Sequence, residues 1–97
     1  MRLILVWLVI INLSSAPLHN TMIMVDDDAI EVGTIKVGEE VKVEIPKDNS
    51  YRVIFTLGQE REEWLGTNKI DFRDTKYKEV DTLKISDESE IFNIEIL

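Results

Sequence analysis

The sequence predicts an all-β sandwich of about seven short strands, and three observations support this fold class. From Met22 onward, apolar residues recur at every second position, which indicates strands rather than helices. Turn-forming residues interrupt these runs about every 8–12 positions, a spacing typical of sandwiches. With 97 residues, the chain has room for one domain.

The first 16 residues have a different composition from the rest. A single arginine precedes an unbroken apolar run from Leu3 to Ile11, and the small residues Ser14 and Ala16 follow. This order of basic, apolar and small residues is typical of a secretory signal. We therefore expect residues 1–16 to be a signal peptide or an uncleaved hydrophobic anchor. The protein would then be extracytoplasmic: secreted, periplasmic or at the cell surface.

Two other interpretations of this run stay open. An anchor that spans a membrane needs about 20 apolar residues, and this run has roughly half that number. The run could also be a buried strand, because isoleucine and valine are plentiful in it. A strand that is apolar at every position requires cover on both faces, which a small domain can hardly provide. We rank the export signal first and the strand last.

Residues 17–28 are expected to form an acidic linker before a sandwich domain at 29–97. The linker ends in Asp26, Asp27 and Asp28, and several carboxylates can bind Ca²⁺. These three are consecutive, whereas calcium loops alternate their ligands so that several oxygens point at one centre. We therefore interpret the run as solvated chain and expect no metal site.

The alternation shifts phase by one residue near Gly33. Ile30 and Val32 are apolar on one side of it, and Ile35 and Val37 on the other. A shift of one residue sends side chains to the opposite face of a sheet, and a glycine there indicates a bulge or kink. We expect this strand to change sheets at Gly33. Such a first strand is a familiar feature of immunoglobulin-like sandwiches, and we assign the domain to that type.

The remaining strands follow from the same alternation. A tight turn is expected around Gly38, and turn residues are expected at 47–50 and 86–89. The expected inward-facing residues are Val41, Val43, Ile45, Tyr51, Val53, Phe55, Leu57, Phe92, Ile94 and Ile96. Two further strands are expected from Ile70 with Phe72, and from Val80 with Leu83 and Ile85, where the alternation shifts phase again. Since the core is small, its aromatic residues matter most, and we expect Phe55, Phe92 and Trp64 to anchor it.

Composition excludes several function classes. Lys and Arg total 11 against 19 Asp and Glu, a formal charge of −8, which disfavours nucleic acid and anionic lipid. There is no cysteine, hence no thiolate ligand or cysteine nucleophile. The single histidine, His19, lies at the expected signal boundary, so no Ser-His-acid triad is possible. We expect neither enzymatic activity nor a cofactor.

One segment resembles a known family. The stretches IKVGEEVKVE and IPKDNSYR are similar to the opening of chagasin-type inhibitors of cysteine proteases, through Gly38, Glu39, Pro46, Asn49, Tyr51 and Arg52. The Thr-Thr-Gly segment that enters the protease cleft in that family is missing, and Val53 replaces the usual aromatic residue. The same stretches also resemble the first hairpin of many immunoglobulin-like domains of exported proteins. That similarity implies a binding or structural role.

The sequence therefore predicts an exported or membrane-tethered module that acts by protein–protein contact, through loops at one end or an edge strand. The candidate contacts are Asn49, Ser50, Tyr51 and Arg52 in one turn, and Trp64 in another. Trp64 could instead be a core residue, since large aromatic side chains are mostly buried. The alternatives are a chagasin-like inhibitor and a structural subunit of an envelope or surface assembly.

Overall fold

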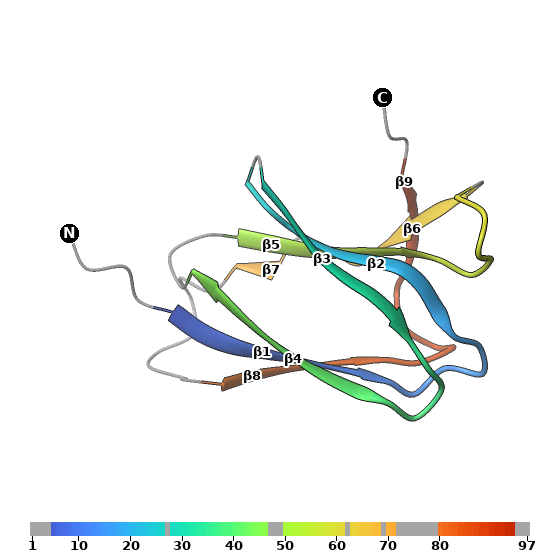
Figure 1. Ribbon diagram of the computed structural model, residues 1–97, viewed down its shortest axis with the longest axis horizontal. Helices are drawn as coiled ribbons and strands as arrows, with labels where there is room; N and C mark the ends of the chain where they lie inside the picture. Colours follow the sequence, from blue (N-terminus) through green and yellow to red (C-terminus); the bar gives the residue numbers. More distant parts are fainter. Residues whose placement is uncertain are drawn as a thin grey trace.

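The computed structural model describes residues 5–26, 28–46, 50–61, 63–68, 70–71 and 80–94 (Figure 1). Its strands are β1 (Leu5–Asn12), β2 (Leu18–Val25), β3 (Asp28–Ile35), β4 (Glu40–Pro46), β5 (Ser50–Thr56), β6 (Trp64–Gly66), β7 (Ile70–Asp71), β8 (Val80–Ile85) and β9 (Phe92–Ile94). Among the described residues, no helix is long and apolar enough to cross a membrane.

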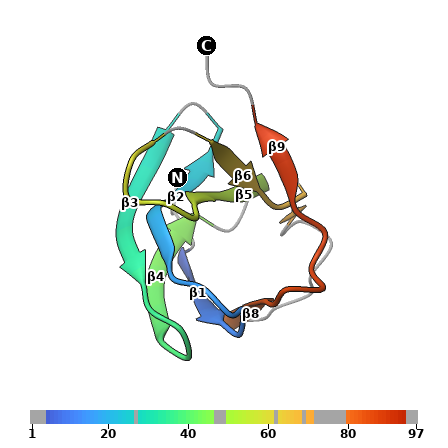
Figure 2. The same cartoon turned by 90° about the vertical axis from the view of Figure 1, so that its right-hand side faces the viewer.

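The strands form two sheets that pack face to face (Figure 2). The smaller sheet has the order β4-β1-β8, with β1 antiparallel to β4 and parallel to β8. The larger sheet has the order β3-β2-β5-β6-β9, and β7 pairs with the start of β5. The predicted all-β sandwich is confirmed.

The core lies between the two sheets and contains side chains from both. Its fully enclosed apolar side chains are Leu8, Ile10, Ile23, Ile35, Ile45, Val53 and Phe55, each 0% exposed. Phe55 is therefore the core aromatic that the alternation predicted. Phe92 was predicted wrongly, because it is 49% exposed on β9. Leu57 was also predicted wrongly, because it follows the end of β5 and is 52% exposed.

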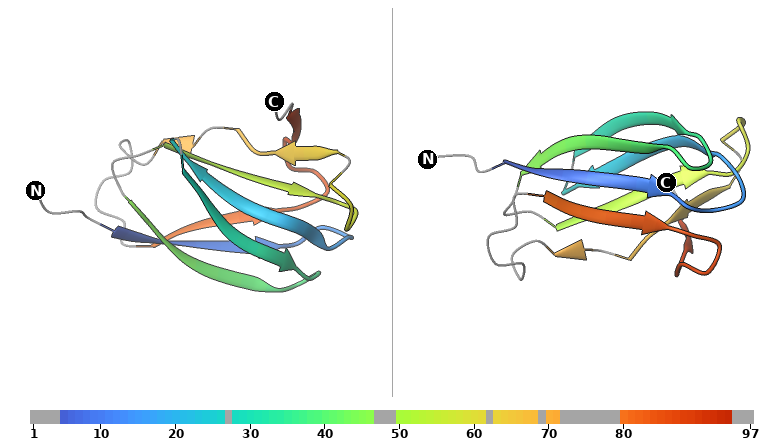
Figure 3. Two further views of the ribbon diagram at one scale, coloured as in Figure 1. Left: turned by 45° about the horizontal axis from the view of Figure 1, so that its top comes forward. Right: turned by 90° about the horizontal axis from the view of Figure 1, so that it is seen from below.

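From Leu5 on, the apolar run expected to precede the domain forms β1, the central strand of the smaller sheet (Figure 3). Val6, Leu8 and Ile10 point into the core, whereas Leu5 and Trp7 lie on the outer face, 47% and 37% exposed. This differs from our expectation of a separate segment. One face of β1 is covered by the larger sheet, and the other is left at the surface, so full cover of both faces is not needed.

The expected acidic linker is also part of the sandwich. Residues 18–25 form β2, which pairs with β3 on one side and β5 on the other. Its Ile23 and Val25 are buried in the core. Asp26 has φ 51° at the hairpin between β2 and β3, a backbone conformation that aspartate tolerates better than most residues. Asp27 lies outside the described residues.

The irregularity at Gly33 is a bulge, as predicted. Thr21 pairs with Gly33 and the next residue, Met22, pairs with Glu31, which leaves Val32 as the extra residue. Gly33 has φ 92°, a conformation open to glycine at little cost. The predicted change of sheet at this position is wrong, because all of β3 stays in the larger sheet. The chain crosses to the smaller sheet at the turn around Gly38.

Asn12, at the end of β1, ties together the turns that join the sheets. It is 0% exposed. Its Nδ2 donates to the carbonyl oxygens of Ala16 at 2.9 Å and Ile35 at 3.0 Å. Its Oδ1 accepts from the Ser14 amide at 3.0 Å and the Ser14 hydroxyl at 2.6 Å. The segment predicted to be a signal boundary thus contains a buried polar network, in which both hydrogen-bonding atoms of the Asn12 side chain have partners.

Candidate functional site

The structure does not bring the predicted contact residues together in one exposed turn. Asn49 lies outside the described residues. Ser50 is 7% exposed and Tyr51 is 1% exposed, so both are buried at the start of β5. Arg52 is exposed on the opposite side of the strand. This corrects the expected recognition turn: of its described members, only Arg52 offers its side chain to a partner.

Tyr51 has a structural role between the two sheets. Its hydroxyl, on β5 in the larger sheet, donates to Oδ2 of Asp81 on β8 in the smaller sheet, at 3.3 Å. Burial, and next the negative charge of Asp81 and its hydrogen bond, raise the pKa of the Tyr51 phenol above its ordinary value near 10. The neutral phenol is therefore the form that the fold requires.

This raised pKa predicts a loss of stability in alkali. Because the folded-state pKa exceeds the unfolded-state pKa, the contribution of Tyr51 is fully present below pH 10 and is lost as pH rises above about 10. Urea denaturation at pH 8 and pH 10.5 measures this loss. Tyr51→Phe should cost about 1 kcal/mol at pH 8, from the lost hydrogen bond, and should lose less stability than the wild type between the two pH values. Equal losses for the two proteins would contradict the assignment.

The outer face of the larger sheet carries an apolar surface, which we call the Trp64 face. Strand register defines it: Met22 pairs with Ile54, and Met24 with Arg52, so these four side chains lie on one face of β2 and β5. Both methionines are half-buried. On the neighbouring strands the face continues through Trp64, Phe92 and Ile94.

Gly66 shapes the centre of the Trp64 face. It pairs with Ile54 on β5 and with Phe92 on β9. A Cβ atom at this position would collide with Cδ1 of Ile94 and would lie 3.1 Å from Cγ2 of Ile54. The missing side chain therefore lets Ile94 fold over Gly66 against Ile54. This packing explains why Ile54 is 3% exposed although it points away from the core.

Charged groups border the Trp64 face. The Arg61 guanidinium lies 5.8 Å from the centroid of the Trp64 ring, within cation–π range. The same guanidinium is 3.9 Å from Oε1 of Glu31 on β3; both side chains are more than half exposed, so this pair adds little stability. Arg52, with Phe92 and Asn93, lines a hollow of about 320 Å³. The border thus carries both signs of charge: Arg52 and Arg61 lie close to aromatic rings, and Glu31 lies beside Met22 on β3.

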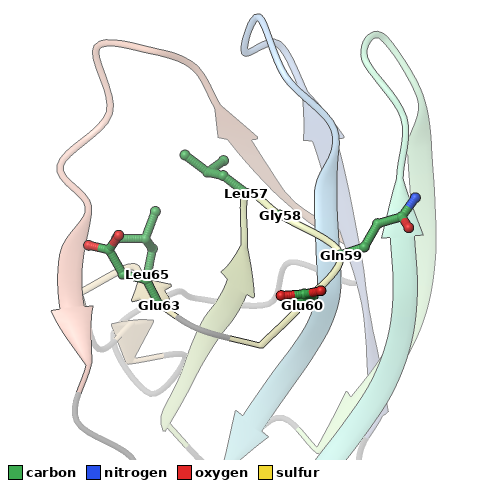
Figure 4. A pocket seen from close by; sticks show the side chains of 6 residues that line it. All are labelled: Leu57, Gly58, Gln59, Glu60, Glu63 and Leu65. Carbon is green, nitrogen blue, oxygen red and sulfur yellow. The ribbon is translucent and has the colours of Figure 1, made fainter.

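Two other hollows are lined by residues in and beside the loops that Figure 1 draws at its right-hand end. One, of about 450 Å³, is lined by the β5–β6 loop (Figure 4). Its described lining contains the carboxylates Glu60 and Glu63 and no serine, histidine or lysine. The other, of about 480 Å³, contains His19, whose Nδ1 is 3.3 Å from the hydroxyl oxygen of Thr34. Within the described residues, no group of three or more His, Asp or Glu side chains could hold a metal ion.

Sequence reasoning placed only two residues of this surface, Arg52 and Trp64, among its candidates. It assigned Phe92 to the core and overlooked Met22 and Met24. The signal for the methionines was present: in the stretch MIMV they alternate with Ile23 and Val25, as the two faces of a strand do. Because this stretch adjoins three aspartates, it was included in the linker.

The comparisons with known proteins identify a family. No curated protein and no solved structure matches the chain. Residues 8–93 match the sequence profile of DUF8725, described as a domain of unknown function. The matched range begins within β1 and ends within β9, so it takes in both sheets of the sandwich. The chain belongs to the DUF8725 family.

Proposed function

We propose that the protein is a non-enzymatic module that acts by protein–protein contact through the Trp64 face. The observation that carries the proposal is Phe92, 49% exposed on a sheet face that also presents Trp64 and two methionines. The outer face of an antiparallel sheet is ordinarily polar where it meets water. A contiguous apolar surface there favours a partner.

The composition of the Trp64 face supports contact with a protein. Tryptophan, phenylalanine, methionine and arginine are enriched in protein interfaces, and tryptophan and arginine dominate their binding energy. Methionine side chains adapt to irregular partner surfaces because they are unbranched and flexible. Arg52 and Arg61 supply charged groups at the border, where they orient a partner more than they tighten its binding.

Export and an immunoglobulin-like relationship stay predictions. A sandwich of two sheets is consistent with the relationship. Export by cleavage after Ala16 would remove β1, and the smaller sheet would lose the strand that joins β4 to β8. The folded protein is therefore compatible with export only where residues 5–12 are retained.

The proposal is tested by a matched pair of surface variants. The biotinylated wild-type chain recovers proteins from its source cells, and each recovered protein is purified and titrated against the variants. Phe92→Ser should weaken the binding of a true partner at least tenfold. Val37→Ser, at a turn residue 54% exposed, should change it less than twofold.

Both variants should remain folded: Val37→Ser should unfold within about 0.5 kcal/mol of the wild type, and Phe92→Ser should cost about 1–2 kcal/mol, because about half of the Phe92 side chain is covered. Urea denaturation checks this. If no recovered protein binds Phe92→Ser more weakly than Val37→Ser, the Trp64 face is not the contact surface.

A further inference from the structure

The outer face of the smaller sheet carries a second apolar surface, which we call the Trp7 face. It consists of the outward residues of β1, namely Leu5, Trp7, Val9 and Ile11, with Val80 on β8 beside Trp7. Leu5, Trp7 and Val80 are 47%, 37% and 44% exposed. This surface does not belong to the Trp64 face, and the inference from it does not depend on the proposed function.

Charges border the Trp7 face on both sides, and their signs differ. On β4, the residues beside Trp7, Val9 and Ile11 are Glu44, Lys42 and Glu40, all exposed. On β8, the residues beside Val9 and Ile11 are Thr82 and Lys84, also exposed. Glu40 and Lys84 thus lie at the same level, on either side of Ile11. Their strands are about 10 Å apart, two strand spacings.

We infer that the Trp7 face binds a second copy of this chain, with the two β1 strands parallel and the two sheets face to face. In this arrangement a twofold axis runs along β1, between the sheets. The axis places β4 of one copy over β8 of the other. Each Glu40 therefore faces the partner's Lys84, and the dimer contains two such contacts. The apolar row of β1 packs against itself, with the two Trp7 rings together at the centre.

The charge pattern selects this arrangement over the alternative. A twofold axis across the strands would place β4 over β4, and Glu40 would then meet the partner's Glu44, a like-charge contact. The cation–π contact of Lys42, whose Nζ lies 4.8 Å from the Trp7 centroid, is formed within one copy and can remain in the dimer. Self-complementarity is the requirement of a twofold interface, and the Trp7 face meets it.

The expected dimer is weak. The Trp7 face is about 20 Å long, and three strands wide, which places it at the low end of specific interfaces. Each copy also carries a formal charge of −8. At physiological ionic strength that repulsion is screened beyond about 8 Å, whereas a direct Glu–Lys contact is screened less. We expect dissociation constants of order 10⁻⁴ M.

Sedimentation of the intact protein up to 1 mM, in 0.15 M salt, tests the inference. The wild type should dimerise reversibly. Glu40→Lys and Lys84→Glu should each weaken the dimer at least fivefold, because each brings like charges together. The combined variant restores both opposite-charge contacts and should recover the wild-type constant within about twofold. Controls with the same net charges, Glu88→Lys and Lys36→Glu, should change it less than twofold.

A wild type that stays monomeric at 1 mM overturns the inference, and so does a combined variant no better than the single ones. Chemical crosslinking provides a second measurement. Val9 lies near the proposed axis, the chain has no cysteine of its own, and face-to-face sheets lie about 10 Å apart, too far for a direct disulfide. With a short bismaleimide that spans about 10 Å, Val9→Cys should form crosslinked dimers at least tenfold faster than Val37→Cys. Equal rates would also overturn the inference.

Discussion

Replacing Leu8 with aspartate is expected to leave the protein unfolded. Leu8 lies in the middle of β1, is 0% exposed, and points into the core between the two sheets. The substitution removes a buried apolar side chain and places a carboxylate where no cation faces it among the described residues. Each effect costs several kcal/mol, and the total stability of a small domain is about 5–15 kcal/mol. Far-UV circular dichroism and a urea titration measure the loss.

Val9→Asp is the matched control, because the next side chain along β1 points outward. It adds the same carboxylate at the surface, between Lys42 and Thr82. At low protein concentration this variant should remain folded, with an unfolding free energy within about 1 kcal/mol of the wild type. Equal effects of the two substitutions would contradict the one-sided burial of β1.

Replacing Asn12 with alanine is expected to cost about 3 kcal/mol of stability. The change removes four side-chain hydrogen bonds and leaves the carbonyl oxygen of Ile35 buried without this donor. Asn12→Asp keeps the shape and the acceptor for Ser14, but its carboxylate faces two carbonyl oxygens that need a donor. It should therefore destabilise the protein at least as much, and more above pH 5 than below, since the protonated acid can donate.

Asn93→Ala serves as the control for Asn12. Asn93 is exposed on β9, and its loss should change the unfolding free energy by less than about 0.5 kcal/mol. Urea denaturation at pH 7 measures all three variants. If Asn12→Ala were as stable as Asn93→Ala, the network around Asn12 would not hold the turns together.

Alternation of apolar residues was enough to predict the middle of the chain. It located β4 and most of β5. The one-residue shift of the alternation at Gly33 located the bulge there. These features are local, since a strand with one buried face has the same period wherever its partners lie in the sequence. On β8, Val80 is exposed, whereas Leu83 and Ile85 point toward the core. The apolar alternation in this strand is therefore regular only for Leu83 and Ile85.

The N-terminal strand could not be recognised in the same way. A signal peptide and a strand that is apolar on both faces have the same composition. What distinguishes them here is the pairing of β1 with residues 40–46 and 80–85, and no local pattern reports such distant partners. The error on 17–28 followed from this one, because a linker was needed only after a signal.

The candidate site was predicted only in part, for a related reason. Alternation assigned Tyr51 to the inward face and Arg52 to the outward face, and the structure confirms both assignments. Turn chemistry at 47–50 favoured an exposed site, whereas the pairing of β5 with β2 buries Tyr51. Phe92 was wrongly assigned to the core. The register between β6 and β9 sets Phe92 opposite Gly66, on the outer face of the larger sheet.

Amide hydrogen exchange of the intact chain tests most directly whether residues 5–12 belong to the folded domain. If β1 is the central strand of the smaller sheet, the amides of Leu8 and Ile10 should be protected to within about tenfold of those of Val53 and Phe55 in β5. Exchange of residues 5–12 at the rate of an unfolded chain, while β5 stays protected, would contradict the account. The N-terminal run would then be a segment outside the sandwich.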